Sequence, residues 1–443
     1  MKLITQANWN VSVEYRFHPV GQGLFASGRI DYVDIESAWL PPSFSWVYDC
    51  GTSSRAKQYL LPELDHLLAR QGGVRGKLDL LVLSHFDKDH INGVIELLER
   101  FQVDTLLLPL VPLWKRLELV FDENIKLSSP LIEFYLSPIN YLLSRYPERV
   151  LHVVLVPATS VDNGESGESY SERRSGSLSG DFIPEPDEAQ AEELTAINKA
   201  YHSRVKFLKP GSSLSIGRVW EFLPYNDMDL QLIPPDWFLR EVNLARSKLT
   251  SHASRRVKES VLKRLKLMYY LLLGNSALAR NKISLFLYCG PVTSNKGIIE
   301  AVVPSTFVRL ADGETKANIN LRFSHSAEGR LGILYTGDGY MSNSRHVYNL
   351  KNYLGPRRWA QISCLQVPHH GARSNWCKGH ATLFSPDLAV FCSDPKRKNT
   401  GHPHREVVAD FAGRTVVQVD KKNGFVIEGK LQLTEPGPDH STL

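Results

Sequence analysis

The stretch Ser84–Val94, SHFDKDHINGV, crowds two histidines and two aspartates into six consecutive positions. These four side chains are His85, Asp87, Asp89 and His90. The stretch follows KLDLLVL (77–83), an apolar run typical of a buried β-strand. Loops beyond the carboxyl ends of strands are where α/β sheets tend to bind ligands. A solvated polar turn is the alternative, because Asp, Lys and Asn are ordinary turn residues. Four metal-competent side chains in so short a loop favour a metal site.

Three later segments bring further His and Asp side chains to the ends of apolar runs. They are ILYTGD (333–338) with Asp338, LQVPHHG (365–371) with His369 and His370, and GHPHREV (401–407) with His402 and His404. Each has an ordinary explanation when taken alone: a turn or cap aspartate, a hydrogen-bonded histidine pair, and a turn that contains proline. Together with the first stretch they supply the nitrogen and carboxylate ligands that a paired-metal site needs.

The composition is that of a soluble globular protein. The 443 residues are 42% hydrophobic and 22% charged, enough for one large domain or two smaller ones. The first residues lack the apolar core of a signal peptide, and the longest apolar runs, such as 106–114, are short and interrupted by proline. Five scattered cysteines without CxxC pairs argue against a disulfide framework or a cysteine-type zinc site. We therefore expect a cytoplasmic protein that does not bind membranes.

The order of the predicted elements is that of an α/β protein. The first fifty residues are rich in β-branched and aromatic residues and predict strands. Residues 56–71 have apolar side chains at helical spacing, and a short helix and another buried strand are predicted after the metal-competent loop. Residues 1–150 are interpreted as the first half of one α/β domain and residues 276–443 as its second half.

Residues 151–275 are interpreted as an insertion between these halves. Its part from about 162 to 193 is rich in Ser, Gly and Glu and predicts a disordered acidic linker. Residues 238–273 predict a helix, and nine Lys or Arg lie between 240 and 266 against Glu241 and Glu259. This basic segment is a candidate surface for a polyanion, although a solvated helix face explains it about equally well.

SHFDKDH resembles the HxHxDH signature of the metallo-β-lactamase fold, with Asp87 in place of the second histidine. Further segments follow in the order seen in the hydrolase domain of ComEC-type DNA-uptake proteins and their soluble relatives. These segments are VGQG (20–23), VYDCG (47–51), RNKISLFL (280–287), TGD, VPHHG and GHPH. The resemblance spans roughly residues 12–110 and 280–428 and does not extend to transport.

The resemblance implies a four-layer αββα fold with a dinuclear metal site. The implied ligands are His85 and Asp87 for one ion, Asp89 and His90 for the other, Asp338 as a bridge, and His369 or His370 together with His402. Asp87, Asp89 and His370 are the implied catalytic residues. Asp49 would orient a ligand histidine. The chain departs from its relatives at Leu24, where they usually carry an acidic residue.

These features predict a metal-dependent hydrolase with two divalent ions, zinc or manganese. The leading hypothesis is a phosphodiesterase or nuclease, with nucleic acid as the partner. Lys396, Lys398 and Arg405 are candidates for binding substrate phosphate, although a solvated turn explains them nearly as well. The alternatives are a hydrolase of a small nucleotide, phosphoester or lactone, and a defence or toxin component that depends on an unspecified protein partner.

Overall fold

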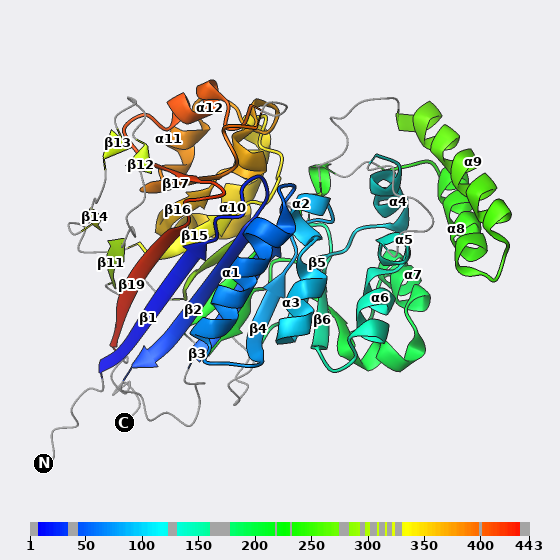
Figure 1. Ribbon diagram of the computed structural model, residues 1–443, viewed down its shortest axis with the longest axis horizontal. Helices are drawn as coiled ribbons and strands as arrows, with labels where there is room; N and C mark the ends of the chain where they lie inside the picture. Colours follow the sequence, from blue (N-terminus) through cyan, green and yellow to red (C-terminus); the bar gives the residue numbers. More distant parts are fainter. Residues whose placement is uncertain are drawn as a thin grey trace, which may run out of the picture.

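The computed structural model describes residues 8–33, 43–122, 131–159, 178–217, 219–230, 233–273, 283–292, 297–301, 308–309, 315–316, 321–323, 330–397 and 401–434. Two large mixed sheets form the centre of this described part, with helices on their outer faces (Figure 1). No helix in these residue ranges combines the length and the apolar character that a membrane crossing requires.

The first sheet contains ten strands within the described residues, in the order β14-β11-β19-β1-β2-β3-β4-β5-β6-β7. Their bounds are β1 Asn8–Phe17, β2 Phe25–Val33, β3 Ser43–Cys50, β4 Gly76–Val82, β5 Phe101–Pro109, β6 Val150–Val156, β7 Val205–Phe207, β11 Gly297–Ala301, β14 Leu321–Phe323 and β19 Phe425–Thr434. Strands β1 to β3 pair antiparallel, whereas β3 to β7 are parallel. The parallel strands therefore have their carboxyl ends on one edge.

The second sheet contains seven strands in the described part of the chain, in the order β18-β17-β16-β15-β10-β9-β8. Their bounds are β8 Leu214–Ile216, β9 Trp220–Tyr225, β10 Phe286–Pro291, β15 Gly332–Tyr335, β16 Ile362–Gln366, β17 Leu388–Cys392 and β18 Thr415–Val419. Strands β15 to β18 are parallel and the others antiparallel. A small separate ladder joins β12 (Val308–Arg309) to β13 (Thr315–Lys316).

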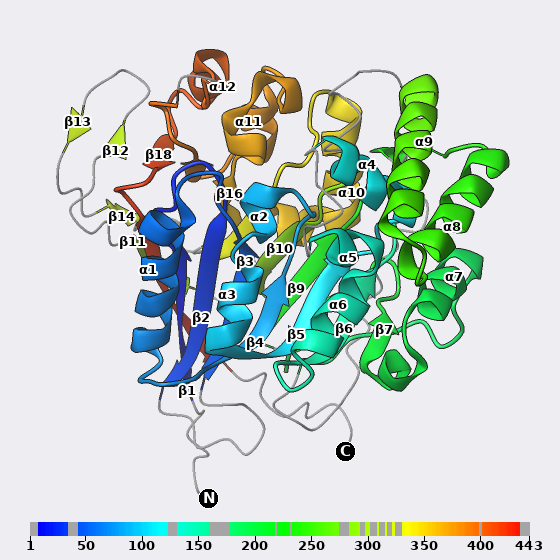
Figure 2. The ribbon, with the colours of Figure 1, turned by 45° about the vertical axis from the view of Figure 1, so that its right-hand side comes forward.

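Helices cover the outer face of each sheet (Figures 1 and 2). Their bounds are α1 Ala56–Arg70, α2 Lys88–Ile91, α3 Val94–Arg100, α4 Leu113–Asp122, α5 Leu131–Leu136, α6 Pro138–Arg145, α7 Glu188–Ala196, α8 Asp236–Thr250, α9 Arg255–Leu273, α10 Ser344–Gln361, α11 His380–Phe384 and α12 Arg405–Asp410. The first sheet carries α1 and α3, and the second carries α10 to α12. The predicted helix over 56–71 corresponds to α1.

The space between the two sheets is filled by apolar side chains from both. Tyr48 of β3 stacks on Tyr335 of β15 with ring centroids 4.7 Å apart, and Trp46 meets Phe222 edge to face at 5.2 Å. All four side chains are buried, and burying large aromatic side chains is a principal source of folding free energy. The layers are thus helix, sheet, sheet and helix, which confirms the predicted αββα fold class.

The segment 151–275, predicted as an insertion, contributes strands to both sheets. Strands β6 and β7 extend the first sheet, and β8 and β9 extend the second. Residues 238–273 form two antiparallel helices, α8 and α9. Within the predicted disordered linker (about 162–193), residues 162–177 lie outside the described residues, whereas residues 178–193 are ordered and include the start of α7.

Residues 178–193 are ordered by contacts that composition does not reveal. Ser179 forms a bridge with Ser215, and Asp187 begins α7 with a capping box that satisfies the first backbone N–H groups of the helix. The buried Arg116 of α4 donates two hydrogen bonds to Glu193 of α7. Acidic residues that reach such partners can fold, although the same residues without partners would stay solvated.

Candidate metal centre

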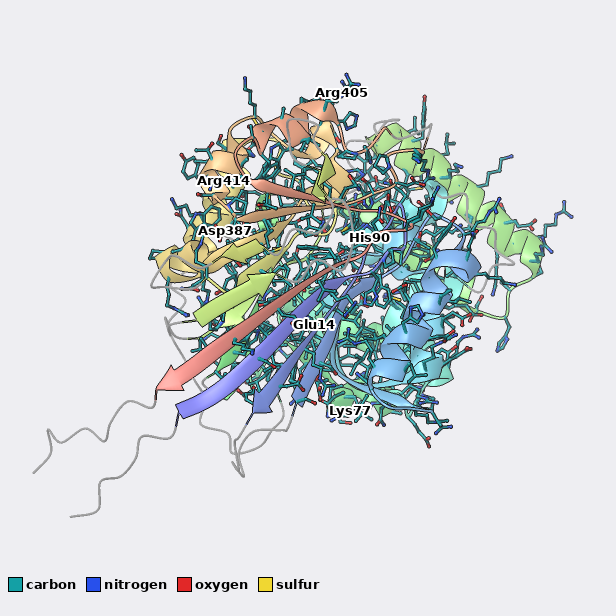
Figure 3. The ribbon with its side chains drawn as sticks, turned by 60° about the vertical axis from the view of Figure 1, so that its left-hand side comes forward. Glu14, Lys77, His90, Asp387, Arg405 and Arg414 are labelled. Atoms are coloured by element: carbon teal, nitrogen blue, oxygen red, sulfur yellow. The ribbon has the colours of Figure 1, made fainter. Side chains whose placement is uncertain are left out.

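The metal-competent loop begins where β4 ends. Asp87 precedes α2 with an extended backbone, and His90 lies within α2 with its side chain fully buried. The loop packs directly on Gly51, because a Cβ atom there would approach His90 N to 2.4 Å. Only a glycine permits this contact, so the DCG segment and the HFDKDH segment depend on each other. Figure 3 labels His90 in the interior, near the ends of the strands.

One group of potential ligands consists of His85, Asp87 and Asp338, whose ligand atoms lie within 4.8 Å of one another. His85 Nε2 is 3.8 Å from Asp87 Oδ2 and 3.9 Å from Asp338 Oδ2. This Nε2 atom is buried and makes no hydrogen bond. Ligand atoms about 2.0–2.1 Å from a tetrahedral zinc ion lie roughly 3.3 Å apart, so a small contraction around an ion would satisfy this nitrogen.

A second group consists of Asp89, His90 and His370. His370 Nε2 lies 3.3 Å from Asp89 Oδ2, and His90 Nε2 lies 3.0 Å from Asp338 Oδ1. Asp338 therefore touches both groups, with one carboxylate oxygen toward each. Burial alone would raise the pKa of the Asp338 carboxyl, but the charges of His369, His90 and His370 hold it well below its usual range.

His85 and His90 are held in the orientation that metal ligation requires. His90 Nδ1 donates to Asp49 Oδ2 at 2.7 Å. Ser84 Oγ donates to the same carboxylate oxygen at 2.6 Å and therefore accepts from His85 Nδ1 at 2.8 Å. When such a ring is neutral and keeps its proton on Nδ1, the lone pair of its Nε2 is directed into the site.

Asp49 adopts a left-handed backbone with φ of 55°. This conformation costs a non-glycine residue about 1–2 kcal/mol, and it is maintained here because the buried carboxylate also accepts from Ser84 N at 2.7 Å. Burial raises the pKa of Asp49, and the positive charge of His90 works against that shift. Asp49 is thus placed to orient His90, as expected from the sequence, and its hydrogen bonds already occupy its oxygen atoms.

The sequence left a choice between His369 and His370, and the structure brings both to Asp338 from opposite sides. Both have left-handed backbones, with φ of 47° and 58°. His370 Nδ1 donates to the carbonyl of Cys392 at 2.6 Å, and its Nε2 faces the second group. His369 Nδ1 donates to Asn375 Oδ1 at 2.8 Å, and its Nε2 lies 3.5 Å from Asp338 Oδ2. His369 therefore approaches the first group.

Of the second histidine pair, His402 lies beside the site. Its ring centroid is 5.6 Å from that of His369 and 6.2 Å from that of His370. Gln22 Nε2 lies 3.4 Å from His402 Nδ1. Burial, followed by the charge of His370, lowers the pKa of His402 to about 3. His404 instead accepts a hydrogen bond from the backbone of Arg373.

The sequence predicts three residues that bind substrate phosphate, and the structure describes two of them. Lys396 and Arg405 are exposed on the surface, and Lys398 lies outside the described residues. Their role stays a prediction. Leu24, at the position where the resemblance predicts an acidic residue, is buried in the core between the sheets and supplies no polar group to the site.

Several polar residues that support the site were not singled out from the sequence. They are Ser84, Gln22, Gln366 and Asn375. Ser84 directly precedes His85, and Gln366 lies within the LQVPHHG segment, so adjacency to a motif was the available signal. Gln366 Oε1 accepts from the backbone of Thr336 and Gly337 and so fixes the turn that presents Asp338.

The donor set fits divalent ions: imidazole nitrogens oriented by hydrogen bonds, carboxylates, and a buried His85 Nε2 that makes no hydrogen bond. The family model of the metallo-beta-lactamase superfamily matches residues 42–197, which include β3 to β6 and the loop from Ser84 to His90. A search of curated proteins found no match. Residues 42–197 are thus similar to the metallo-beta-lactamase superfamily, whose members are in general metal-dependent hydrolases.

Proposed function

We propose that the protein is a metal-dependent phosphodiesterase that cleaves nucleic acid. The observation that carries the proposal is the pair of ligand groups joined by Asp338. Divalent ions held by these residues would lower the pKa of a bound water molecule and would neutralise the charge that develops on an attacked phosphoryl group. Manganese or zinc suits this mixture of imidazole and carboxylate ligands, and Asp87 makes the set harder than a second histidine would.

The open side of the site identifies the residues that meet substrate and water. The side chains of Asp87, Asp89 and His369 are 19%, 23% and 26% exposed, whereas those of His90 and Asp338 are at most 3% exposed. Substrate therefore approaches over these three side chains. Burial alone would raise the pKa of Asp89, but the hydrogen bond from His370 and the charge of His90 lower it to about 2. Asp89 is consequently ionised at neutral pH and accepts hydrogen bonds from an attacking water.

The choice of a nucleic acid is supported by two further features. The first is the resemblance of the ordered motifs to the hydrolase domain of DNA-uptake proteins. The second is the basic hairpin of α8 and α9, since clustered Lys and Arg side chains bind phosphate backbones. In residues 236–273 nine Lys or Arg stand against three acidic residues, a net charge of +6, while the whole chain has +5. The excess positive charge of the molecule is thus concentrated in this hairpin.

The test compares cleavage of labelled single- and double-stranded DNA and RNA by the wild type and by Asp89→Ala, each loaded with Mn²⁺ or Zn²⁺. Bis(p-nitrophenyl) phosphate and a simple lactone serve as small substrates. A matched control is Asp65→Ala, because Asp65 is an exposed carboxylate on α1 that pairs with Arg100. We expect metal-dependent phosphodiester cleavage that Asp89→Ala abolishes and Asp65→Ala preserves. Cleavage of the lactone alone would contradict the proposal.

A further inference from the structure

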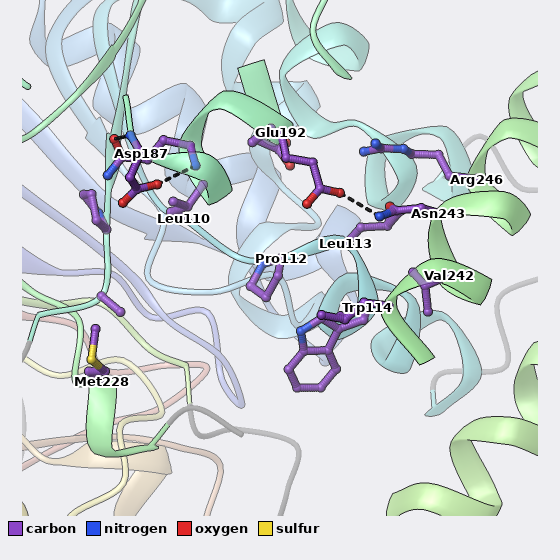
Figure 4. A pocket seen from close by; sticks show the side chains of 15 residues that line it. Leu110, Pro112, Leu113, Trp114, Asp187, Glu192, Met228, Val242, Asn243 and Arg246 are labelled. Atoms are coloured by element: carbon purple, nitrogen blue, oxygen red, sulfur yellow. Dashed lines mark hydrogen bonds between the residues drawn. The ribbon is translucent and has the colours of Figure 1, made fainter. Parts of the chain in front are cut away.

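A cleft of about 290 Å³ opens beyond the carboxyl ends of β5 and β6 (Figure 4). Its walls come from the segments after these two strands and from α4, α7 and α8. Strand β5 is the neighbour of β4, and β6 is the next strand along. Neighbouring strands lie about 4.8 Å apart, so the cleft begins roughly 5–10 Å along the sheet edge from the loop that carries His85. The cleft and the metal centre therefore share one edge of the sheet.

The floor of the cleft is apolar. Leu110, Pro112 and Trp114 line it from the β5 side, and Leu239 and Val242 line it from α8. Figure 4 shows the indole of Trp114 beside Pro112 and Val242. Such a surface gains free energy by covering a flat apolar body, at roughly 25 cal/mol for each Å² removed from water.

The carboxylates that line the cleft are already engaged within the protein. Asp187 caps the first turn of α7. Glu192 accepts a hydrogen bond of 2.8 Å from the side chain of Asn243, and Glu193 is held by both terminal nitrogens of Arg116. These acidic groups are therefore poorly placed to bind a cation from a ligand.

Arg246 differs from these carboxylates. Its guanidinium makes no ion pair and no hydrogen bond with any residue in the described ranges. Figure 4 shows the group directed from α8 toward the α7 side of the cleft. An arginine presents a rigid fork of donors that matches phosphate and carboxylate oxygens. The cleft thus offers an apolar floor and one cation that lacks an anionic partner among these residues.

We propose that this cleft is a substrate subsite that holds one nucleotide of an unpaired nucleic-acid strand, with the base on the apolar floor and a phosphate at Arg246. The inference rests on the proposed function. A base has flat apolar faces, and it can enter such a cleft only when it is not paired.

The hairpin of α8 and α9 carries further exposed cations outside the cleft. Arg240, Lys248, Arg256 and Lys263 are exposed and, like Arg246, have no ion pair with a residue that the structure describes. Trp237 and Tyr270 are also exposed, at 48% and 55%, and lie next to the packed pair Phe238 and Tyr269. Exposed aromatic rings among cations are typical of surfaces that bind single strands.

Binding is tested in chelator, where no cleavage occurs, with a short fluorescent oligothymidylate as the probe. The variant is Arg246→Met, which keeps the aliphatic stem, and the matched control is Arg75→Met, an exposed arginine directly before β4 that does not line the cleft and lies outside the hairpin. We expect Arg246→Met to weaken binding about tenfold and Arg75→Met less than about twofold, because one charged hydrogen-bonded contact is lost only in the former. Arg246→Lys should recover part of the affinity.

Cleavage supplies a second readout. In Arg246→Met the KM for the oligonucleotide should rise with little change in kcat, while bis(p-nitrophenyl) phosphate, which reaches only the metal centre, should be cleaved at the wild-type rate. Equal weakening by both Met variants, or unchanged binding in Arg246→Met, would overturn the subsite. Failure of the wild type to cleave any phosphodiester would instead defeat the proposed function, and the binding result would still stand on its own.

Discussion

The metal centre and the cleft between α4, α7 and α8 lie on the same sheet edge but are built differently. In the metal centre the histidines are oriented by hydrogen bonds to buried acceptors. His90 donates to Asp49, and His370 donates to the carbonyl of Cys392. In the cleft, Arg246 lies at a partly exposed position and has no described partner. The centre is thus preorganised before any ligand arrives, whereas in the cleft a ligand would pair with Arg246, which has no partner among the described residues.

This difference follows from what each region has to do. Groups that hold ions must be placed to within a fraction of an ångström, and buried hydrogen bonds provide that placement. A surface that holds a flexible polymer gains from side chains that can adjust to it, and its contacts are individually worth little. Substitutions at the metal centre should therefore have large effects on chemistry, and those around the cleft smaller effects on binding.

The largest effect is expected for Asp338→Ala, because Asp338 contacts both ligand groups. The substitution should lower metal content from two ions to fewer than one for each chain and reduce phosphodiesterase activity at least about a thousandfold. Elemental analysis of the purified protein measures the first effect. Asp387→Ala, which removes a partly exposed carboxylate paired with Arg330, is the control. Loss of a single ion would show that Asp338 serves only one of the groups.

The next effect is the pH dependence of metal affinity. Burial lowers the pKa of His90 and of His370, but Asp338 and their other carboxylate neighbours outweigh it, so both pKa values lie above the usual value in the metal-free protein. Burial and the charge of His90 lower the pKa of His85 to about 3, so this ring is already unprotonated.

Ion binding must therefore release a proton from His90 and one from His370, and affinity should rise with pH below their raised pKa values. The rise should approach about a hundredfold for each pH unit, since each released proton contributes a factor of about ten. Competition with a chelator at several pH values measures the slope. In His370→Ala the slope should fall to about tenfold, and an unchanged slope in this variant would exclude His370 from the ligand set.

The clustering of the candidate ligands in the metal-competent loop was predictable because they are contiguous in the sequence. The order of TGD, HHG and GHPH added the later candidates, since parallel strands bring their carboxyl ends to one edge. The approach of His369 and His370 to opposite oxygens of Asp338 was not predictable, because it depends on two left-handed backbones and on the distant acceptors Asn375 and Cys392. Such contacts leave no local pattern.

The cleft was not predictable for a related reason. One of its walls is α7, which lies at the end of a segment whose composition indicates disorder. That helix is ordered by the ion pair between Glu193 and the buried Arg116, seventy-seven positions away. Composition describes what a segment can bury by itself, and it cannot show which partners the rest of the chain provides.

A smaller effect on metal affinity than that of Asp338→Ala is expected for Asp49→Asn. This variant tests whether the hydrogen bond that orients His90 contributes to the affinity of the metal centre. The amide retains the shape of the carboxylate but loses its charge and can no longer accept at both oxygen positions. Metal affinity should fall roughly ten- to a hundredfold, the usual cost of losing a partner of a ligand histidine. Asp79→Asn, at a carboxylate that accepts from Ser45 in the same sheet, is the control. Equal affinities in the two variants would contradict the orienting role.

The smallest effect is expected on the cleft side, for Tyr269→Phe. Tyr269 Oη donates to the carbonyl of Trp114 at 2.5 Å and so ties α9 to α4. Phenylalanine keeps the edge-to-face contacts of the ring with Phe121 and Phe238. The free energy of unfolding should fall by about 1 kcal/mol, the usual net value of one buried hydrogen bond. Urea denaturation measures the loss.

The neighbouring Tyr270→Phe is the matched control, because Tyr270 is exposed and makes no hydrogen bond with a described residue. Tyr269→Phe should also raise the KM for the oligonucleotide slightly, since α4 carries Trp114 of the cleft floor, and should leave metal content and cleavage of bis(p-nitrophenyl) phosphate unchanged. A loss of metal in this variant would show that the two regions are mechanically coupled. A raised KM for the oligonucleotide together with an unchanged metal content would mean that binding along the sheet edge can be altered while the ions stay in place.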